Sequence, residues 1–282
     1  MPAPNKILNP QKLTEIAHQV RRDIIRMLFK AGSGHSAGSL GMADVLTALY
    51  FAVLNHDPDR PKWPDRDRLV LSNGHICPAL YAVLSRAGYF KTSELQTLRK
   101  LGSRLQGHPS RLDLPGIENS SGPLGQGISM AIGICLAAKL NQKKHDVYCL
   151  MGDGEQNEGQ VWEAYLFAGK YQLDNLTVII DRNSIQLDGY TKDIMPLEPL
   201  KAKLEAFNFH VLEIDGHNFE NIIDACHQAK AIFTKPVAII SYTIPGKGVE
   251  EIEFDPGWHG KVPDKKQAEI FLKQLKNNRL YG

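Results

Sequence analysis

The chain has 282 residues, of which 43% are hydrophobic and 23% are charged, as in an ordinary globular protein. Its 33 Lys and Arg residues nearly balance its 31 Asp and Glu residues, and the two signs are mixed along the chain. This pattern provides neither the basic stripe of a nucleic-acid-binding protein nor a polybasic membrane segment. We therefore expect no nucleic-acid and no membrane partner, and any anionic ligand must be bound locally.

The start of the chain, "MPAPNKILNPQKL", lacks the apolar core of a signal peptide, and no apolar run is long enough to span a bilayer. The four cysteines are scattered, and they form no Cys-x-x-Cys pair. These features predict a cytoplasmic protein whose cysteines are reduced packing residues.

Helical periodicity appears first, as an apolar stripe from Leu13 to Leu28, with Gly32 where a C-terminal cap would lie. The loop "AGSGHSAGSLG" follows, then a second helix at about 42–54 and a short strand, "RLVLS", ending at "NGH". The rest of the chain alternates between the two element types, with strands expected at 147–151, 176–181, 210–214 and 236–242 and helices at 125–142, 157–172, 197–206 and 219–233.

The expected strands are apolar on both faces, which is typical of a parallel sheet covered by helices on both sides. We therefore predict a doubly wound α/β fold with a mostly parallel sheet. The sequence shows no linker or repeat, so we expect one domain over 1–282, with 1–10 as an N-terminal extension and 264–282 as a C-terminal helix and tail. In such folds the ligand lies beyond the carboxyl ends of the strands.

The stretch "MGDGEQNEGQVWEA" has the composition of a phosphate and metal site. Gly152 and Gly154 permit a tight turn and close approach of a ligand, and Asp153 supplies a hard oxygen donor before a helix. Asn183 lies about 30 residues downstream, just past the next strand. Two oxygen side chains and a backbone carbonyl could thus bind one Mg²⁺, with phosphate and water completing its six oxygens.

Other interpretations of these loops are weaker, although a lone Gly-Asp-Gly is usually only a turn. An EF-hand fails because Glu158 and Ala164 occupy the positions that require Gly and Glu. A dinucleotide-binding loop in "GQGISMAIG" fails because Met130 replaces the third glycine, and no Walker loop is present.

"GDG" followed after about 25 residues by Asn is the thiamine-diphosphate fingerprint. Around it, "AGSGHSAGSLGMAD", "LSNGHICPALYA", "LQGHPS", "SSGPLGQGISMAIG" and "GWHGKVP" occur in the order found in transketolases. From about residue 11 to 262, the sequence resembles the N-terminal, diphosphate-binding domain of transketolase.

The resemblance implies a set of cofactor ligands. Asp153, Asn183 and the backbone carbonyl of Ile185 would hold a Mg²⁺ or Ca²⁺ ion that clamps the diphosphate of thiamine diphosphate. The other cofactor-binding residues would be His75, Gly122, Pro123, Leu124, Gly152, Gly154, Glu158, Lys247 and His259. Glu158 would lie at the contact between cofactor sites, or it is simply a capping or surface carboxylate. Lys261 is a further candidate for an anion contact.

The resemblance also assigns catalytic roles to four histidines, although any single histidine is more often structural. His35 and His259 would flank the bound sugar and the reacting carbon, His75 would lie near the diphosphate, and His108 would contact substrate hydroxyls. Histidine suits these roles because it donates hydrogen bonds and exchanges protons near neutral pH. The sequence departs from many relatives at Ser36, where they carry Pro, and at Asn73, where some carry Lys. These departures leave the donor and acceptor sugars open.

The implied activity is transfer of a two-carbon unit from a ketose phosphate to an aldose phosphate, with chemistry supplied by the cofactor. Transketolases continue into a pyrimidine-binding domain that completes the active site, and this sequence stops at Gly282. We therefore expect the N-terminal subunit of a split transketolase, which forms a heterotetramer with a separate C-terminal subunit. A truncated piece of a longer protein is the alternative.

The sequence leaves two other functions open and disfavours a third. The chain could belong to a related thiamine-diphosphate enzyme acting on an unusual sugar or sulfosugar. It could be a non-catalytic module that binds the cofactor or a partner. A nucleotide-binding dehydrogenase is disfavoured because the glycine pattern is missing.

Overall fold

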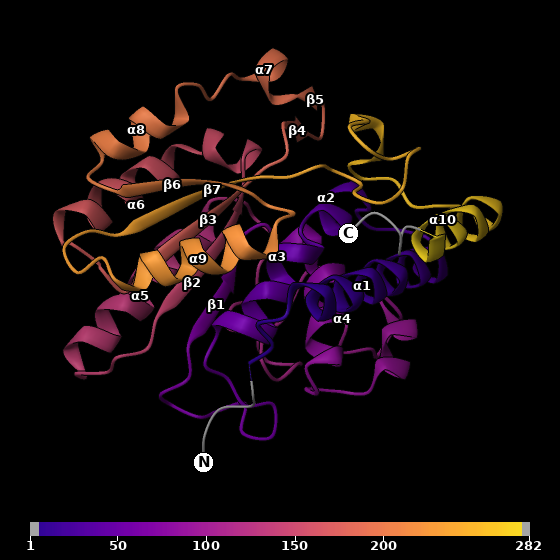
Figure 1. Ribbon diagram of the computed structural model, residues 1–282, viewed down its shortest axis with the longest axis horizontal. Helices are drawn as coiled ribbons and strands as arrows, with labels where there is room; N and C mark the ends of the chain where they lie inside the picture. Colours follow the sequence, from indigo (N-terminus) through magenta and orange to yellow (C-terminus); the bar gives the residue numbers. More distant parts are fainter. Residues whose placement is uncertain (1–5, 278–282) are drawn as a thin grey trace.

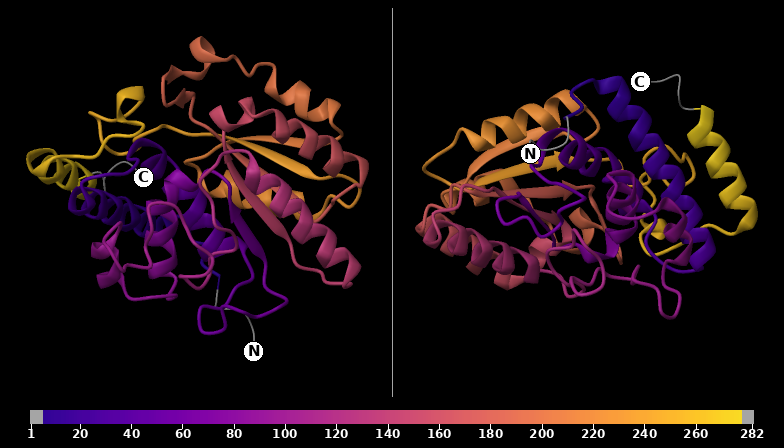
Figure 2. Two further views of the ribbon diagram at one scale, coloured as in Figure 1. Left: turned by 180° about the vertical axis from the view of Figure 1, so that it is seen from behind. Right: turned by 90° about the horizontal axis from the view of Figure 1, so that it is seen from below.

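A computed structural model describes residues 6–277 and has a parallel sheet between two layers of helices (Figures 1 and 2). The strands are β1 (Arg68–Leu71), β2 (Val147–Gly152), β3 (Leu176–Arg182), β6 (His210–Asp215) and β7 (Val237–Tyr242). Their order in the sheet is β1-β2-β3-β7-β6, and each neighbouring pair is parallel. The predicted doubly wound α/β fold is confirmed.

Strand side chains are buried on both faces of the sheet, as the sequence predicts. Alternate side chains of a strand point to opposite faces. In β2, Cys149 and Met151 pack into one apolar cluster with α5 (Gln126–Leu140), α6 (Gly159–Lys170) and α8 (Leu200–Ala206). Tyr148 and Leu150 pack into the other cluster, with α1 (Pro10–Ala31), α4 (Cys77–Arg86) and α9 (Phe219–Lys230).

The position of β7 explains why α9 covers a different face from α5 and α6. Successive crossovers run outward from β1 through β2 and β3 to the edge strand β6, and the chain then returns to place β7 between β3 and β6. Right-handed crossovers put their helices on opposite faces when the direction of travel reverses. The loops that leave the carboxyl ends of β1, β2 and β3 consequently share one edge of the sheet.

Local signals fix the ends of α1. The Asn9 side chain accepts a hydrogen bond from the Lys12 N–H, and Pro10 occupies the first turn, where its missing N–H costs nothing. Gly32 ends the helix at φ 69°, a left-handed conformation that favours glycine. Of the expected N-terminal extension, residues 1–5 lie outside the described residues, and the Ile7 N–H donates to the carbonyl of Phe51.

Several elements differ from the sequence-based expectation. The helix expected at 42–54 is split into α2 (Ala37–Gly41), α3 (Ala43–Ala48) and a π-helical turn, η1 (Leu49–Val53). The helix expected at 157–172 is preceded by a 3₁₀ turn, η4 (Gly154–Asn157), and ends at Lys170. The helix expected at 197–206 begins at Leu200, with Pro199 as its N-cap in an extended conformation, because a proline disfavours helical backbone at the residue before it.

No sequence pattern predicts the small antiparallel hairpin of β4 (Ile185–Gln186) and β5 (Gly189–Tyr190), which is followed by α7 (Thr191–Ile194). The 3₁₀ turns η2 (Gly74–Ile76), η3 (Thr92–Thr97) and η5 (Pro256–Trp258) were also not expected. The predicted C-terminal helix is present as α10 (Lys265–Asn277). Residues 278–282 of the predicted tail lie outside the described residues.

The four cysteines agree with the prediction of buried packing residues. All four are buried and free, at positions Cys77, Cys135, Cys149 and Cys226. Burial raises the pKa of each thiol, and that of Cys77 reaches about 12. Among residues 6–277, no helix is both long and apolar enough to cross a membrane.

Candidate active site

A cavity of about 400 Å³ lies at the carboxyl edge of the sheet. Its walls come from the loops that follow β1, β2 and β3, from the loop after α1, from the turn before α5 and from the segment around His259. Twelve of the residues singled out from the sequence line it: His35, Asn73, His75, Gly122, Leu124, Gly152, Asp153, Gly154, Glu158, Asn183, Ile185 and His259. The structure thus brings the Gly-Asp-Gly turn, the asparagine and three of the four histidines to one place.

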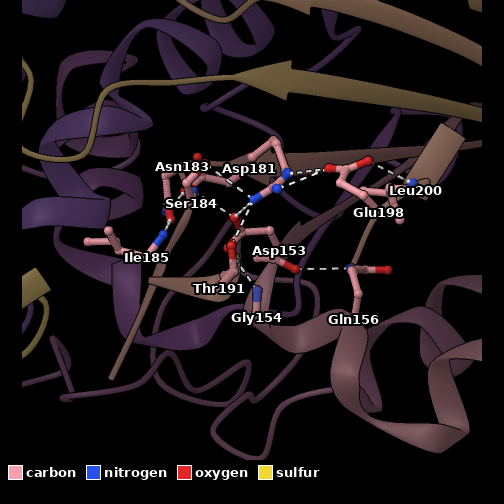
Figure 3. A network of polar contacts seen from close by, with 12 residues as sticks. Asp153, Gly154, Gln156, Asp181, Asn183, Ser184, Ile185, Thr191, Glu198 and Leu200 are labelled. Atoms are coloured by element: carbon pink, nitrogen blue, oxygen red, sulfur yellow. Dashed lines mark hydrogen bonds and ion pairs between the residues drawn. The ribbon is translucent and has the colours of Figure 1, made fainter. Parts of the chain in front are cut away.

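Asp153 is a buried carboxylate held by donors from three directions (Figure 3). Its Oδ1 accepts the Gly154 N–H at 2.8 Å. Its Oδ2 accepts the Ser184 N–H at 2.7 Å and Nη1 of Arg182 at 2.8 Å. Burial raises the pKa of Asp153, and the positive charge and hydrogen bond of Arg182 oppose that increase.

Asn183 is oriented by its neighbours in the sequence. Its Nδ2 donates to Oδ2 of Asp181 at 2.8 Å, so its amide oxygen is the atom left for other contacts. That oxygen accepts the Ile185 N–H at 3.0 Å. Asp181 also accepts the hydroxyl of Thr243, and burial raises the pKa of Asp181 to about 7. Sequence analysis missed Asp181, although an acidic residue ending the apolar run "LTVIID" is a signal that could have identified it.

These donors fit a hard divalent ion. A carboxylate oxygen or amide oxygen has two lone pairs, and the hydrogen bonds just described occupy one on Asp153 Oδ1 and one on Asn183 Oδ1. Each atom therefore has one position left, and Ile185 lines the same part of the cavity. Within residues 6–277, no group of three or more His, Cys, Asp or Glu side chains is arranged to hold a metal ion.

The Gly-Asp-Gly glycines have different surroundings. A Cβ on Gly154 would lie 3.0 Å from Cβ of Gln186, so the absence of a side chain lets the hairpin approach the turn. A Cβ on Gly152 would be 3.9 Å from its nearest neighbour, which is ordinary contact. The close approach of the hairpin therefore requires a residue without a side chain at Gly154.

Glu155, which sequence analysis also missed, connects three loops of the cavity. Its Oε1 accepts the hydroxyl of Ser72 and the Gly125 N–H at 2.7 Å, and its Oε2 accepts the Gly152 N–H at 3.0 Å. The Ser72 hydroxyl in turn accepts the Gly127 N–H at 3.0 Å. Glu155 and Ser72 therefore cap the first turn of α5, whose own N-cap, Gly125, has no side chain.

Three of the predicted histidines form a cluster. The ring centroid of His35 lies 5.0 Å from that of His75 and 5.6 Å from that of His259. The centroids of His75 and His259 are 5.2 Å apart. Burial lowers the pKa of all three, and that of His35 falls to about 4. The rings are therefore neutral at pH 7 and act as hydrogen-bonding groups. Nδ1 of His35 and Nδ1 of His259 are buried without a hydrogen-bond partner in the described structure.

Three predicted site residues do not line the cavity, and Glu158 lines it but is exposed. His108, Pro123 and Lys247 are not among the lining residues, although a Cβ on Gly74 would come within 3.2 Å of the His108 ring. Glu158 is exposed and makes no side-chain capping bond, so the simple capping role is not seen. Nζ of Lys261 lies 4.2 Å from the centre of the Trp258 ring.

The structure shows the surroundings of Ser36 and Asn73, the two residues at which the sequence departs from the family pattern. The buried Ser36 hydroxyl donates to the carbonyl of Lys261 at 2.6 Å and so fastens the loop of His35 to that of His259. Proline could not make this bond. Asn73 lines the cavity, and its buried Oδ1 has no partner among the described residues.

The sequence matches the family described as "Transketolase, thiamine diphosphate binding domain" over residues 13–277. The chain belongs to this transketolase family. It is 47% identical over 232 residues to the 6-deoxy-6-sulfo-D-fructose transketolase subunit SqwG of Clostridium sp. (strain MSTE9), covering 82% of this chain and 84% of that protein. It is 39% identical to an apulose-4-phosphate transketolase subunit of Actinobacillus succinogenes, covering 96% of this chain and 98% of that protein.

Single-chain transketolases are longer. The crystal structure of the Campylobacter jejuni transketolase superposes with a TM-score of 0.89 at 38% identity, covering 96% of this chain and 43% of that one. Human transketolase is 37% identical over 94% of this chain and 42% of its own length. The chain thus spans about two fifths of these transketolases and most of the length of the relatives named as subunits.

Proposed function

We propose that this chain is the N-terminal subunit of a thiamine-diphosphate-dependent transketolase. It transfers a two-carbon ketol unit from a ketose phosphate to an aldose phosphate together with a separate C-terminal, pyrimidine-domain subunit. The observation that carries the proposal is the convergence of Asp153, Asn183 and the histidine cluster on one cavity. The near-complete alignment with proteins named as transketolase subunits supports it.

The cofactor is thiamine diphosphate, and its diphosphate is held through Mg²⁺ by Asp153, Asn183 and the carbonyl of Ile185. The one position left on each side-chain oxygen supports this ligand set. When bound, the cofactor supplies the electron sink that carbon–carbon bond cleavage needs. The protein supplies binding, orientation and exclusion of water.

The neutral histidines of this chain orient the sugar. His35 and His259 have buried nitrogen atoms that are free to bond sugar hydroxyl or carbonyl oxygens, and their lowered pKa values keep them uncharged at pH 7. His75 lies against both rings, on the diphosphate side in this proposal. His108 and Lys247, outside the cavity wall, are proposed as contacts for the distal part of the substrate and for anionic groups.

The partner supplies the groups that this cavity lacks. Relatives named as subunits imply a second chain, and we propose a heterotetramer in which two copies of each subunit form two sites. Glu158 is exposed beside the cavity, as a residue at the contact between two such sites must be. Residues 1–282 act as a single diphosphate-binding domain in this assembly.

The test is two-carbon transfer from xylulose 5-phosphate to ribose 5-phosphate, with thiamine diphosphate and Mg²⁺, in mixtures with the C-terminal subunit. The relatives are named for different sugars, so a donor panel that includes apulose 4-phosphate and 6-deoxy-6-sulfofructose belongs in the assay. Activity with a ketose phosphate supports the proposal and identifies the sugar, whereas activity with 6-deoxy-6-sulfofructose alone supports the related enzyme that acts on an unusual sugar.

Variants in the same assay distinguish the enzyme from the alternative function, a non-catalytic module. Asp153→Ala and His259→Ala should each abolish turnover, while Lys273→Gln, at an exposed position on α10 outside the cavity lining, should keep it. Failure of the wild-type mixture on every donor, despite a stable complex with bound cofactor, would contradict the proposed enzyme.

A further inference from the structure

We propose that Ser36 is a positioning residue that holds His259 opposite His35. It does so by fastening the far end of the segment 254–261, which we call the strap. The inference rests on the proposed function, because it concerns how the groups that orient the sugar are held. It gives a role to a residue at which the sequence departs from the family pattern.

The first half of the strap is held by contacts with two neighbouring elements. The strap lies between the loop that follows β7 and the loop that leads to α10 (Figure 1). At its start, the Tyr190 hydroxyl donates to the carbonyl of Phe254 at 3.1 Å. Trp258 is buried, and its ring centroid lies 5.5 Å from that of Phe271 on α10. His259 follows Trp258 directly and lines the cavity.

The part of the strap that follows His259 depends on Ser36. Among the described residues, the Ser36 hydroxyl is the one group that hydrogen-bonds to the backbone of 260–262, and it donates to the Lys261 carbonyl at 2.6 Å. The side chain of Lys261 contacts the Trp258 ring, which belongs to the strap itself. Loss of the Ser36 hydroxyl would therefore leave this end of the strap without a hydrogen bond to the rest of the chain.

The position of Ser36 in the chain favours this bond over a local one. Ser36 is the N-cap residue of α2, where a serine side chain commonly accepts an N–H of the first turn. Here the side chain makes no capping bond. Ser36 is also 0% exposed, so water does not compete for its hydroxyl. The bond to Lys261 is therefore the contact that this buried hydroxyl serves.

The bond joins the two backbone segments that carry facing histidines. His35 immediately precedes Ser36, and His259 lies shortly before Lys261. The rings of His35 and His259 meet edge to face, with centroids 5.6 Å apart. A Cβ on Gly260 would lie 4.0 Å from the His35 ring, so the strap backbone itself packs beside His35. A shift of the strap would therefore move His259 relative to His35, and misplacement by about 1 Å can cost about 100-fold in rate.

The first test measures hydrogen–deuterium exchange in the strap by mass spectrometry, on the full chain without substrate. The N–H groups of Trp258 and His259 are hydrogen-bonded within η5, so their exchange reports opening of the strap. Ser36→Ala should speed exchange in peptides covering 254–261 by roughly tenfold, the factor that corresponds to one ordinary hydrogen bond. Ser85→Ala, the matched control, removes another buried serine hydroxyl, on α4, and should leave strap exchange within about twofold of wild type.

The second test measures two-carbon transfer in mixtures with the C-terminal subunit, at saturating thiamine diphosphate and Mg²⁺. Ser36→Ala should lower kcat/KM for the ketose donor by roughly 10- to 100-fold, because His259 is no longer held opposite His35. Ser85→Ala should keep the wild-type value. A merely structural role for Ser36 would instead lower Tm and leave kcat/KM of the folded variant unchanged.

Equal strap exchange in Ser36→Ala and wild type would overturn the inference, and so would faster exchange with an unchanged kcat/KM. If Ser36→Ala does not fold, Ser36→Cys, whose thiol is a weak donor, gives the same comparisons. Failure of the wild-type mixture on every donor would count against the proposed function. The exchange measurement needs no turnover, so it still decides whether Ser36 holds the strap.

Discussion

Replacing Glu155 tests whether this buried carboxylate supports the cavity. Its neighbours present three donors: the Ser72 hydroxyl and the backbone N–H groups of Gly125 and Gly152. A buried donor left without a partner costs about 1–3 kcal/mol. Glu155→Ala orphans all three, and water entering from the cavity recovers part of the loss, so we expect about 3–6 kcal/mol of destabilisation.

Glu155→Gln separates the hydrogen bonds from the charge. The amide oxygen can keep the two donors that Oε1 receives, but the amide NH₂ then faces the Gly152 N–H, donor against donor. One orphaned donor costs about 1–3 kcal/mol. Burial raises the pKa of Glu155, which means that the charge itself is disfavoured in the folded protein, and removing it recovers part of that cost. We expect a net loss of about 1–2 kcal/mol.

Thermal unfolding followed by circular dichroism measures both effects. At about 2–4 °C per kcal/mol for a chain of this size, Glu155→Gln should lower Tm by roughly 2–8 °C and Glu155→Ala by roughly 6–24 °C. Glu158→Gln is the control, since that carboxylate lies in the same turn but is exposed. Equal Tm values for Glu155→Ala and this control would refute the capping role of Glu155.

Three further predictions address the histidines, the helix contacts and the metal. The pKa of His35 is about 4 in the folded protein, against an ordinary value of 6.5. The contribution of His35 to stability should therefore be fully present above pH 6.5 and fall by about 1–2 kcal/mol as the pH is lowered towards 4. If the Tm of His35→Gln falls with pH as steeply as that of the wild type, this prediction is wrong. Gly169→Ala should lower the free energy of unfolding by at least about 2 kcal/mol, because its Cβ would lie 2.1 Å from a backbone oxygen. Gly133→Ala, with open space around the added Cβ, should stabilise α5 by about 0.5–1 kcal/mol. Urea unfolding measures both changes, and the reverse ranking would contradict the packing described for these two glycines. Removing divalent ions with EDTA should weaken thiamine diphosphate binding roughly tenfold or more, because the diphosphate and the Asp153 carboxylate then repel each other without a cation between them. Equal affinities with and without Mg²⁺, measured by calorimetry, would exclude the metal bridge.

The fold class could be predicted from the sequence because the expected strands are apolar on both faces. That pattern requires helices on both sides of a parallel sheet, which the structure has. The hairpin of β4 and β5 could not be predicted, because its strands have two residues each and lack periodicity. The split of the second helix is likewise invisible in a continuous apolar run.

The sequence also located most of the cavity wall, since Asp153 and Asn183 follow neighbouring parallel strands. It did not identify the residues that support them. Asp181, Glu155 and Arg182 act through hydrogen bonds to groups distant in sequence, such as Thr243 and Gly125. Those partners are determined by the packing of loops, which short motifs do not encode.

The most direct test of the central claim is a titration of this chain with its C-terminal partner chain, at saturating thiamine diphosphate, Mg²⁺ and sugars. The account predicts no two-carbon transfer by either chain alone, and a rate that rises linearly to a plateau when the two chains are equimolar. Turnover by this chain alone would contradict the claim that it holds only half of a shared active site.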